Sequence, residues 1–141
     1  MIKLKSIEEQ LILHEGMKLK PYRCPAGKLT IGVGRNLEDK GLSKQEALFL
    51  LRRDIAEVTN ELRKYPWFET LDMVRQKVLI DMAFNLGING LLSFKKMLSY
   101  LKAGDYEKAA DEMVNSRWYG QVGDRAKRLV KMMRTGEDYK N

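Results

Sequence analysis

Three side chains with different chemistry lie within sixteen residues near the start of the chain: Glu15, Cys24 and Thr30. A carboxyl group can donate a proton to a leaving oxygen, while a thiol and a hydroxyl can hold a water molecule. Each residue type is also common in a purely structural role, as a solvated Glu, a small buried Cys or a Thr on a strand. Only their convergence in space would make them a catalytic site.

The carboxyl group lies at the end of a predicted helix. Ser6 and Glu9 form a capping box, in which the Ser6 hydroxyl accepts from the Glu9 amide, and Gly16 is a natural helix stop. Glu15 therefore falls in the last turn, where the negative end of the helix dipole favours the protonated carboxyl group. A general acid requires that form.

The thiol and the hydroxyl lie on a predicted hairpin. Pro21 excludes a helix, and residues 22–24, 25–28 and 29–33 have the pattern of strand, turn and strand. Cys24 and Thr30 should then lie within a residue or two of being cross-strand neighbours. Both could face the end of the first helix.

Two glycines lie at the end of the second predicted strand. Gly32 and Gly34 indicate close approach of another group to the backbone, although tight strand packing explains them as well. We expect residues 35–41 to be a loop with room for one more short strand.

The rest of the chain has a helical pattern. Ser43 and Glu46 form a second capping box, and the apolar positions that follow predict a helix over 43–64, about 30 Å long, before Pro66 breaks it. Four later helices are expected, with Asp72, Ser93, Asp105 and Asp124 as their caps. The first ends at Gly87 and the second at Gly104, the third covers 106–114, and the fourth covers 125–134 before Gly136. The pattern predicts an α+β fold that is mostly helical.

Composition limits what the protein can bind. One cysteine and one histidine exclude an internal disulfide and the usual His/Cys metal sites, so we expect no structural metal. Glu8 and Glu9 interrupt any signal-peptide apolar region, and no run of about 18 apolar residues predicts a membrane span. We therefore expect a cytosolic protein. The net charge of +7 favours a polyanionic partner, which could be nucleic acid, an anionic membrane or a cell-wall polymer.

A basic amphipathic segment lies near the C-terminus. Its cations, interleaved with apolar residues, are Arg125, Lys127, Arg128, Lys131 and Arg134. The segment could insert into a membrane or attract a wall polymer, but we expect a docked helix with a solvated charged face. Trp67, Trp118 and most methionines are expected in the core rather than on a recognition surface.

The spacing of the three reactive residues is that of a known family. Glu15, Cys24 and Thr30, separated by eight and five residues and embedded in His-Glu-Gly and Thr-Ile-Gly-Val-Gly, resemble the catalytic triad of the phage-type lysozymes, the endolysins of tailed bacteriophages. The similarity extends from about Glu8 to Asn141. It continues in the motifs Asp81-Met82-Ala83-Phe84-Asn85-Leu86-Gly87, Ser116-Arg117-Trp118-Tyr119, Arg125-Ala126-Lys127-Arg128 and Arg134-Thr135-Gly136.

The resemblance implies a lysozyme-like fold in a single domain of residues 1–141. A small N-terminal β-hairpin lobe, about 14–42, would be joined by a connecting helix, 43–64, to a helical lobe made of 1–13 and 65–141.

The resemblance also implies an N-acetylmuramidase, which hydrolyses the β-1,4 bond between N-acetylmuramic acid and N-acetylglucosamine in peptidoglycan. Glu15 would be the general acid, and Arg125 would pair with it across a cleft. Gly34 and Phe84 fall where the family lines its sugar subsites.

Such an enzyme needs no cofactor and works as a monomer, without nucleic acid or stable membrane insertion. It would wait in the host cytoplasm until a separate holin permeabilises the membrane and gives access to peptidoglycan.

Cys24 departs from the aspartate of many family members, and this leaves two mechanisms open. In an inverting mechanism, Cys24 and Thr30 position a water on the far face of the sugar ring; in a retaining one, Cys24 attacks the anomeric carbon directly. We favour inversion, because Thr30 is suited to hold water and the resemblance points the same way. The rival functions are a non-catalytic cationic wall or membrane binder and a small nucleic-acid binder.

Overall fold

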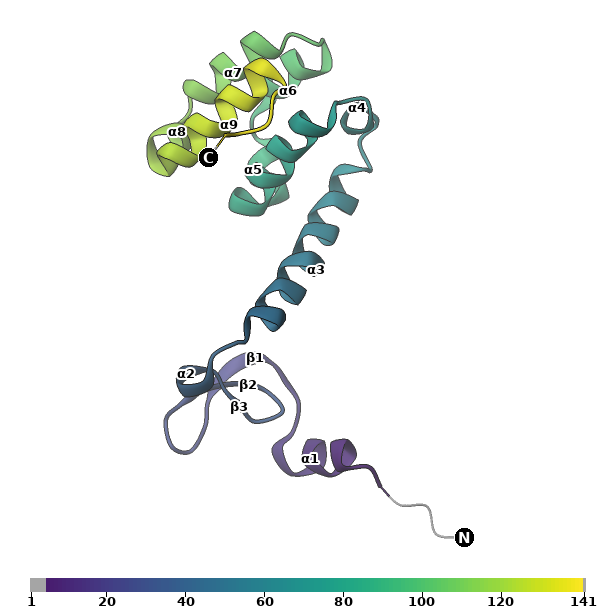
Figure 1. Cartoon of the computed structure of the whole chain (residues 1–141), viewed down its shortest axis with the longest axis vertical. Coiled ribbons are helices and arrows are strands. Elements are labelled where there is room, and N and C mark those ends of the chain that lie inside the picture. Colours follow the sequence, from purple (N-terminus) through teal and green to yellow (C-terminus); the bar gives the residue numbers. More distant parts are fainter. Residues whose placement is uncertain (1–4, 141) are drawn as a thin grey trace. The chain divides into compact units, whose positions relative to one another are not determined.

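The computed structural model describes residues 5–140, which contain nine helices and three strands (Figure 1). Two compact units divide the chain, Met1–Leu50 and Leu51–Asn141. The first contains a three-stranded antiparallel sheet, and the described part of the second is helical. The predicted α+β, mostly helical fold class is therefore confirmed. The predicted lobe boundaries stay a prediction.

The first helix, α1 (Ile7–Glu15), has the predicted ends. The Glu9 N–H donates to Ser6 Oγ at 3.0 Å. Gly16, with φ 75°, follows the helix, and its N–H donates to Ile12 O at 2.8 Å. Glu15 therefore lies in the last turn, as predicted.

The sheet has the strand order β1-β2-β3, with β1 (Lys18–Arg23), β2 (Leu29–Gly32) and β3 (Arg35–Asn36). The predicted hairpin is confirmed, and its turn is closed by the Gly27 N–H, which donates to Cys24 O at 2.8 Å. β1 starts earlier than predicted and includes Pro21. An edge strand tolerates proline, because one row of its N–H groups needs no partner in the sheet.

Helix α2 (Leu37–Lys40) replaces most of the loop predicted over 35–41, so that expectation is wrong. Asn36 caps the helix, since its Oδ1 accepts from the Asp39 N–H at 3.0 Å. A helix of one turn is too short for apolar periodicity to reveal. The short strand for which the loop had room is β3.

The long helix α3 (Lys44–Leu62) begins with the predicted capping box. The Glu46 N–H donates to Ser43 Oγ at 3.1 Å, and the Ser43 N–H donates to Glu46 Oε1 at 2.9 Å. Arg35 Nη2 donates to the same carboxylate oxygen at 2.7 Å, so β3 is tied to the start of α3. The helix ends at Leu62, two residues before the predicted end. Pro66 begins the short α4 (Pro66–Glu69), because proline fits the first helical turn.

Five helices complete the second unit: α5 (Met73–Leu92), α6 (Lys95–Lys102), α7 (Tyr106–Val114), α8 (Arg117–Val122) and α9 (Asp124–Thr135). Two predicted caps are confirmed. Asp72 accepts from the Arg75 N–H, and Asp105 accepts from the Lys108 N–H, both at 3.1 Å.

The predicted helix end at Gly87 is confirmed as a break, because Gly87, with φ 78° and ψ 161°, leaves the helical conformation. A second helical stretch, which was not predicted, follows it to Leu92 within α5. The predicted cap at Ser93 is wrong. Ser93 does not cap α6, because its hydroxyl donates to Gly90 O at 2.6 Å and Phe94 takes the cap position.

The start of α9 and the existence of α8 also differ from expectation. Asp124 is the first residue of α9, and Gly123 occupies the cap position that was predicted for it. Helix α8 was not predicted, although Ser116 caps it by accepting from the Tyr119 N–H at 3.3 Å.

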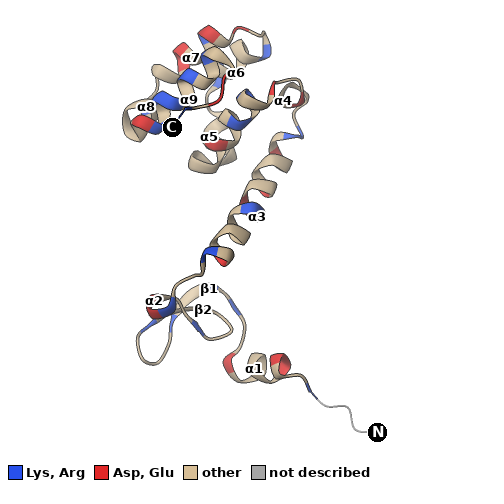
Figure 2. Ribbon diagram, viewed as in Figure 1, with Lys and Arg blue, Asp and Glu red and all other residues tan. Residues whose placement is uncertain are grey.

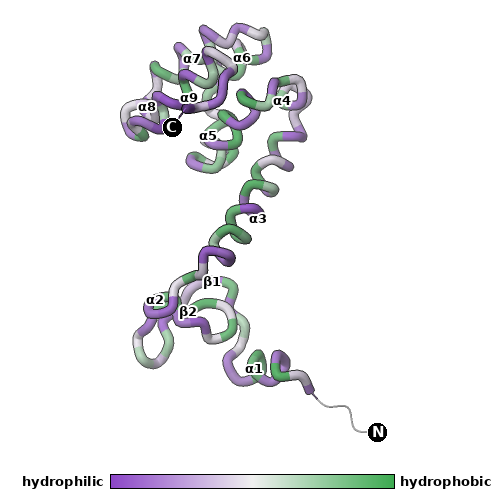
Figure 3. The backbone as a smooth tube through the Cα atoms, viewed as in Figure 1, coloured by the Kyte–Doolittle hydropathy of each residue, from purple (hydrophilic) through white to green (hydrophobic). Residues whose placement is uncertain are grey.

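The buried core lies in the second unit, and Figure 3 shows apolar segments recurring along α5. Its largest fully buried side chains are Phe68, Leu62, Leu79, Met82, Leu91, Met97, Met113, Met133 and Val78. Trp118 is 4% exposed and Trp67 packs against this core, so both tryptophans lie where they were predicted. In the described part of the chain, the bent pair α5–α6 has the length and apolarity of a membrane span, but no single helix has.

Arg75 of α5 fastens the C-terminus of α9. Its Nε donates to Met133 O at 2.8 Å and its Nη2 to Arg134 O at 3.2 Å. The guanidinium also lies over the ring of Tyr106, with Cζ 3.8 Å from the centroid. Gly136, with φ 67°, packs against this guanidinium: an added Cβ would lie 2.8 Å from Nη1 of Arg75.

Gly136→Ala is expected to lower the free energy of unfolding by about 3 kcal/mol, the sum of left-handed strain and weakened charged hydrogen bonds. Gly104→Ala is the matched control. Gly104 also has a positive φ (77°), but, its chain neighbours aside, no atom in the described part of the chain lies within 4 Å of an added Cβ. This substitution should cost only about 1 kcal/mol. Urea unfolding measures the loss of unfolding free energy in both variants. Equal losses would show that the Arg75 side chain can move aside at no cost in free energy.

Candidate active site

In the first unit, the carboxylate of Glu15 lies against the backbone of Gly34. An added Cβ on Gly34 would lie 2.5 Å from Oε2 of Glu15 and 2.8 Å from its Cδ. The close approach predicted at Gly34 is thus confirmed, and the approaching group is the predicted acid. At Gly32, apart from its chain neighbours, no atom of residues 5–140 lies within 4 Å of an added Cβ, so its φ of 70° explains that glycine.

Cys24 and Thr30 meet on one face of the hairpin. Tyr22 pairs with Thr30, and Cys24, two residues after Tyr22, shares its face and lies diagonal to Thr30. Cys24 is half-buried, and Thr30 is 3% exposed. The predicted proximity of these two side chains is confirmed.

Hydrogen-bond donors around Cys24 favour its thiolate. The backbone N–H of Lys28 is the largest cause that holds the pKa of the Cys24 thiol below its ordinary value. The N–H of Ala26 and the hydroxyl of Thr30 act in the same direction, and burial opposes them. The Thr30 hydroxyl donates to Lys28 O at 2.8 Å. Because it has one proton, it can serve this carbonyl or the thiolate, but not both.

Cys24 is therefore expected to react with iodoacetamide at a lower pH than a free cysteine. Hydrogen bonds to the thiolate favour ionisation, which moves the midpoint of the rate against pH downward. Thr30→Val removes one donor and should move that midpoint back upward. An unchanged midpoint in Thr30→Val would mean that the Thr30 hydroxyl serves only the Lys28 carbonyl.

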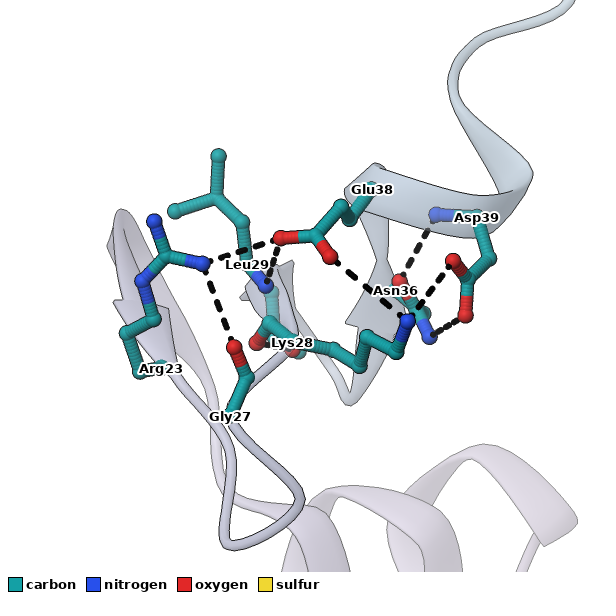
Figure 4. A network of polar contacts seen from close by, with 8 residues as sticks. Arg23, Gly27, Lys28, Leu29, Asn36, Glu38 and Asp39 are labelled. Atoms are coloured by element: carbon teal, nitrogen blue, oxygen red, sulfur yellow. Dashed lines mark hydrogen bonds and ion pairs between the residues drawn. The ribbon is translucent and has the colours of Figure 1, made fainter.

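A network of ion pairs ties the hairpin turn to α2 (Figure 4). Arg23 Nη1 donates to Gly27 O at 3.1 Å and to Glu38 Oε1 at 2.9 Å. Lys28 Nζ lies 3.3 Å from Asp39 Oδ1. Exposed pairs contribute only about 0.2–1 kcal/mol each, but several pairs to one helix restrict the turn more than a single pair would.

In the second unit, Phe84 and Arg125 line one groove of about 420 Å³. The remaining residues that line it come from α3 and α5: Leu51, Ile55, Lys77, Ile80 and Asp81. Phe84 is 44% exposed, so its ring is accessible from this groove. The structure brings together the two support residues that were predicted in this unit.

Asp81 is the partner of Arg125 within the second unit. Arg125 Nε donates to Asp81 Oδ1 at 2.7 Å, and Nη2 lies 2.7 Å from the same oxygen. No role was predicted for Asp81, because no local pattern relates residues 44 positions apart. The expected pairing of Arg125 with Glu15 stays a prediction.

The basic segment 125–134 belongs to α9, which is docked on the core (Figure 2). Its buried residues are Ala126, Leu129, Val130, Met132 and Met133, while Lys127, Arg128 and Lys131 are exposed. Arg134 pairs with Glu107 at 2.7 Å and with Asp111 at 2.8 Å. The interpretation as a docked helix with a solvated charged face is confirmed.

Metal ligands are not clustered in the part of the chain that the structure describes. Among residues 5–140, no group of three or more His, Cys, Asp or Glu side chains is placed to hold a metal ion.

Known proteins match most of this chain. The family described as phage lysozyme matches residues 13–136, which include every predicted site residue. Probable T4-type lysozyme 1 of Dictyostelium discoideum is 30% identical over 165 residues, covering 94% of this chain and 96% of that protein. An endolysin of Acyrthosiphon pisum secondary endosymbiont phage 1 is 32% identical over 117 residues, covering 76% of both chains.

A third relative is much longer than this chain. The pre-baseplate central spike protein Gp5 of Enterobacteria phage T4 is 32% identical over 160 residues. The match covers 93% of this chain but 28% of Gp5, so the chain corresponds to one part of that protein.

Proposed function

Because the chain belongs to the phage lysozyme family, and is a glycoside hydrolase of the lysozyme type, we propose that it hydrolyses the β-1,4 bond between N-acetylmuramic acid and N-acetylglucosamine in peptidoglycan. The observation that supports this most is the position of Glu15, which is the last residue of α1 and whose carboxylate lies against the backbone of Gly34. The Cys24–Thr30 pair lies in the same unit and supplies the second set of groups that the reaction needs.

In the proposed reaction, Glu15 is the general acid. It donates its proton to the glycosidic oxygen as the bond to the anomeric carbon breaks. Glu15 is exposed, so a sugar chain can reach it. The contact with Gly34 restricts where the carboxylate can lie, and an acid must be held in place to act on a bound substrate.

Cys24 and Thr30 position the attacking water on the far face of the sugar ring. Since Thr30 is 3% exposed and Cys24 only half-buried, Cys24 contacts the water and Thr30 orients the sulfur through its hydroxyl. A lowered thiol pKa makes the thiolate available to take the proton from water. We therefore propose inversion, with direct attack by Cys24 as the alternative.

Phe84 and Arg125 support the reaction from the second unit. The exposed ring of Phe84 offers an apolar face to a sugar, and Gly34, against which Glu15 lies in the first unit, is proposed to line a sugar subsite. Arg125 is proposed to pair with Glu15, because a guanidinium suits a carboxylate partner.

The name endolysin, which the phage relative carries, favours action on the host cell wall from within. We propose that the enzyme is a monomer, waits in the host cytoplasm and reaches peptidoglycan once a holin permeabilises the membrane.

Incubating the pure protein with peptidoglycan and measuring new reducing ends tests the proposed reaction. Reducing N-acetylmuramic acid ends are expected, and their absence would exclude a muramidase. NMR of the first product separates the mechanisms: an α anomer indicates inversion, whereas a β anomer indicates attack by Cys24. Alkylation of Cys24 should abolish activity in either mechanism, and full activity of the alkylated protein would make Cys24 structural.

A further inference from the structure

Arg125 is held on one side by a single carboxylate, that of Asp81. Nε and Nη2 of Arg125 both lie 2.7 Å from Oδ1 of Asp81, and Nη2 also donates to the backbone O of Asp81 at 3.3 Å. These contacts join α9 to α5 and fix the guanidinium to a side chain and to a main chain. Within residues 5–140, Nη1 of Arg125 has no hydrogen-bond or ion-pair partner, so one edge of the guanidinium is open to another acceptor.

The positive charges near Arg125 explain why it needs the carboxylate of Asp81 as a partner. Two grooves meet at Arg125, and the other charged residues that line them are Lys77 of α5 and Arg128 of α9. Asp81 is the only acidic residue among the described residues that line either groove. Lys77 is offset by Asp138, whose Oδ2 lies 2.6 Å from its Nζ. Without Asp81, repulsion from Arg128 would favour conformations of Arg125 that point away from the groove.

Asp81 also lies near Phe84 in the sequence. Asp81 and Phe84 are three positions apart on α5, so their side chains share one helix face. The same groove is lined by Asp81, Phe84 and Arg125. A guanidinium anchored on Asp81 is thereby kept at the groove that Phe84 also lines.

We propose that Asp81 is a positioning residue, which holds Arg125 at the groove and leaves Nη1 of its guanidinium without a partner among residues 5–140. This inference rests on the proposed function, because the role of Arg125 comes from it. Asp81 itself touches neither the sugar nor the water. It acts through Arg125, so its contribution should vanish when Arg125 is gone.

A double-mutant cycle on kcat/KM for peptidoglycan tests this. Asp81→Asn is expected to lower kcat/KM by about ten-fold, because a displaced supporting group costs one to two orders of magnitude. Asp81→Glu, which keeps the charge, should recover part of that loss. In an Arg125→Gln background, Asp81→Asn should cause no further loss. Losses that multiply, or an Asp81→Asn enzyme as active as the parent, would overturn the inference.

Asp111→Asn is the matched control. Asp111 also pairs with an arginine of α9, at 2.8 Å from Arg134, but it lines neither groove. Its variant should keep the parent kcat/KM, and urea unfolding checks that all variants are folded. If the parent releases no reducing ends, the proposed function fails and the inference fails with it. If the parent is active and the losses multiply, only the inference fails.

Discussion

Glu15→Gln is expected to lower kcat/KM for peptidoglycan by about 10³-fold, the middle of the range that general acid catalysis contributes. The amide has nearly the shape of the carboxyl group but cannot give up a proton to the glycosidic oxygen. The Glu15 side chain is exposed at the end of α1 and makes no side-chain hydrogen bond or ion pair among residues 5–140, so the fold should persist. The loss should therefore appear in kcat/KM and not in the free energy of unfolding.

Release of reducing ends and urea unfolding, measured on the same protein samples, separate these effects. Glu8→Gln is the matched control, because Glu8 is an exposed glutamate at the other end of α1. It should keep the parent activity. A cationic wall or membrane binder would lose nothing in either variant, so lysis by Glu15→Gln at the parent rate would favour that rival function.

The parts of the fold that sequence patterns predicted correctly are those decided within a few residues. The caps at Ser6, Ser43, Asp72 and Asp105 each depend on one side chain and an amide three positions later, and all four are present. The short helix α2 was missed because apolar periodicity needs several helical turns to become visible. A helix as short as α2 does not repeat its apolar positions, so Asn36 was the only local sign of it.

The candidate site divides in the same way. The proximity of Cys24 and Thr30 could be predicted from the sequence, because a short turn fixes the register of a hairpin. The contact of Glu15 with Gly34 was expected only as the approach of some group to a glycine. The Asp81–Arg125 pair depends on how α9 packs against α5, which is decided by the core around them and by no pattern near either residue.

Gly34→Ala is expected to lower kcat/KM by about 10²-fold, the cost of moving a catalytic group by about 1 Å. The new methyl group would lie 2.5 Å from Oε2 of Glu15, so one of the two must move. The Glu15 side chain is exposed and can move to another rotamer, whereas the backbone at Gly34 is held between β2 and β3. The carboxylate should therefore give way, and the acid would leave the place from which it protonates the substrate.

Gly32→Ala separates this displacement from backbone strain. Both glycines have a positive φ, 64° at Gly34 and 70° at Gly32, but an added Cβ at Gly32 meets no atom of the described residues within 4 Å, apart from its chain neighbours. Each variant should lose about 1 kcal/mol of unfolding free energy to left-handed strain. Only Gly34→Ala should lose most of its activity. Equal activity losses in the two variants would mean that strain in the sheet, and not the position of Glu15, limits the reaction.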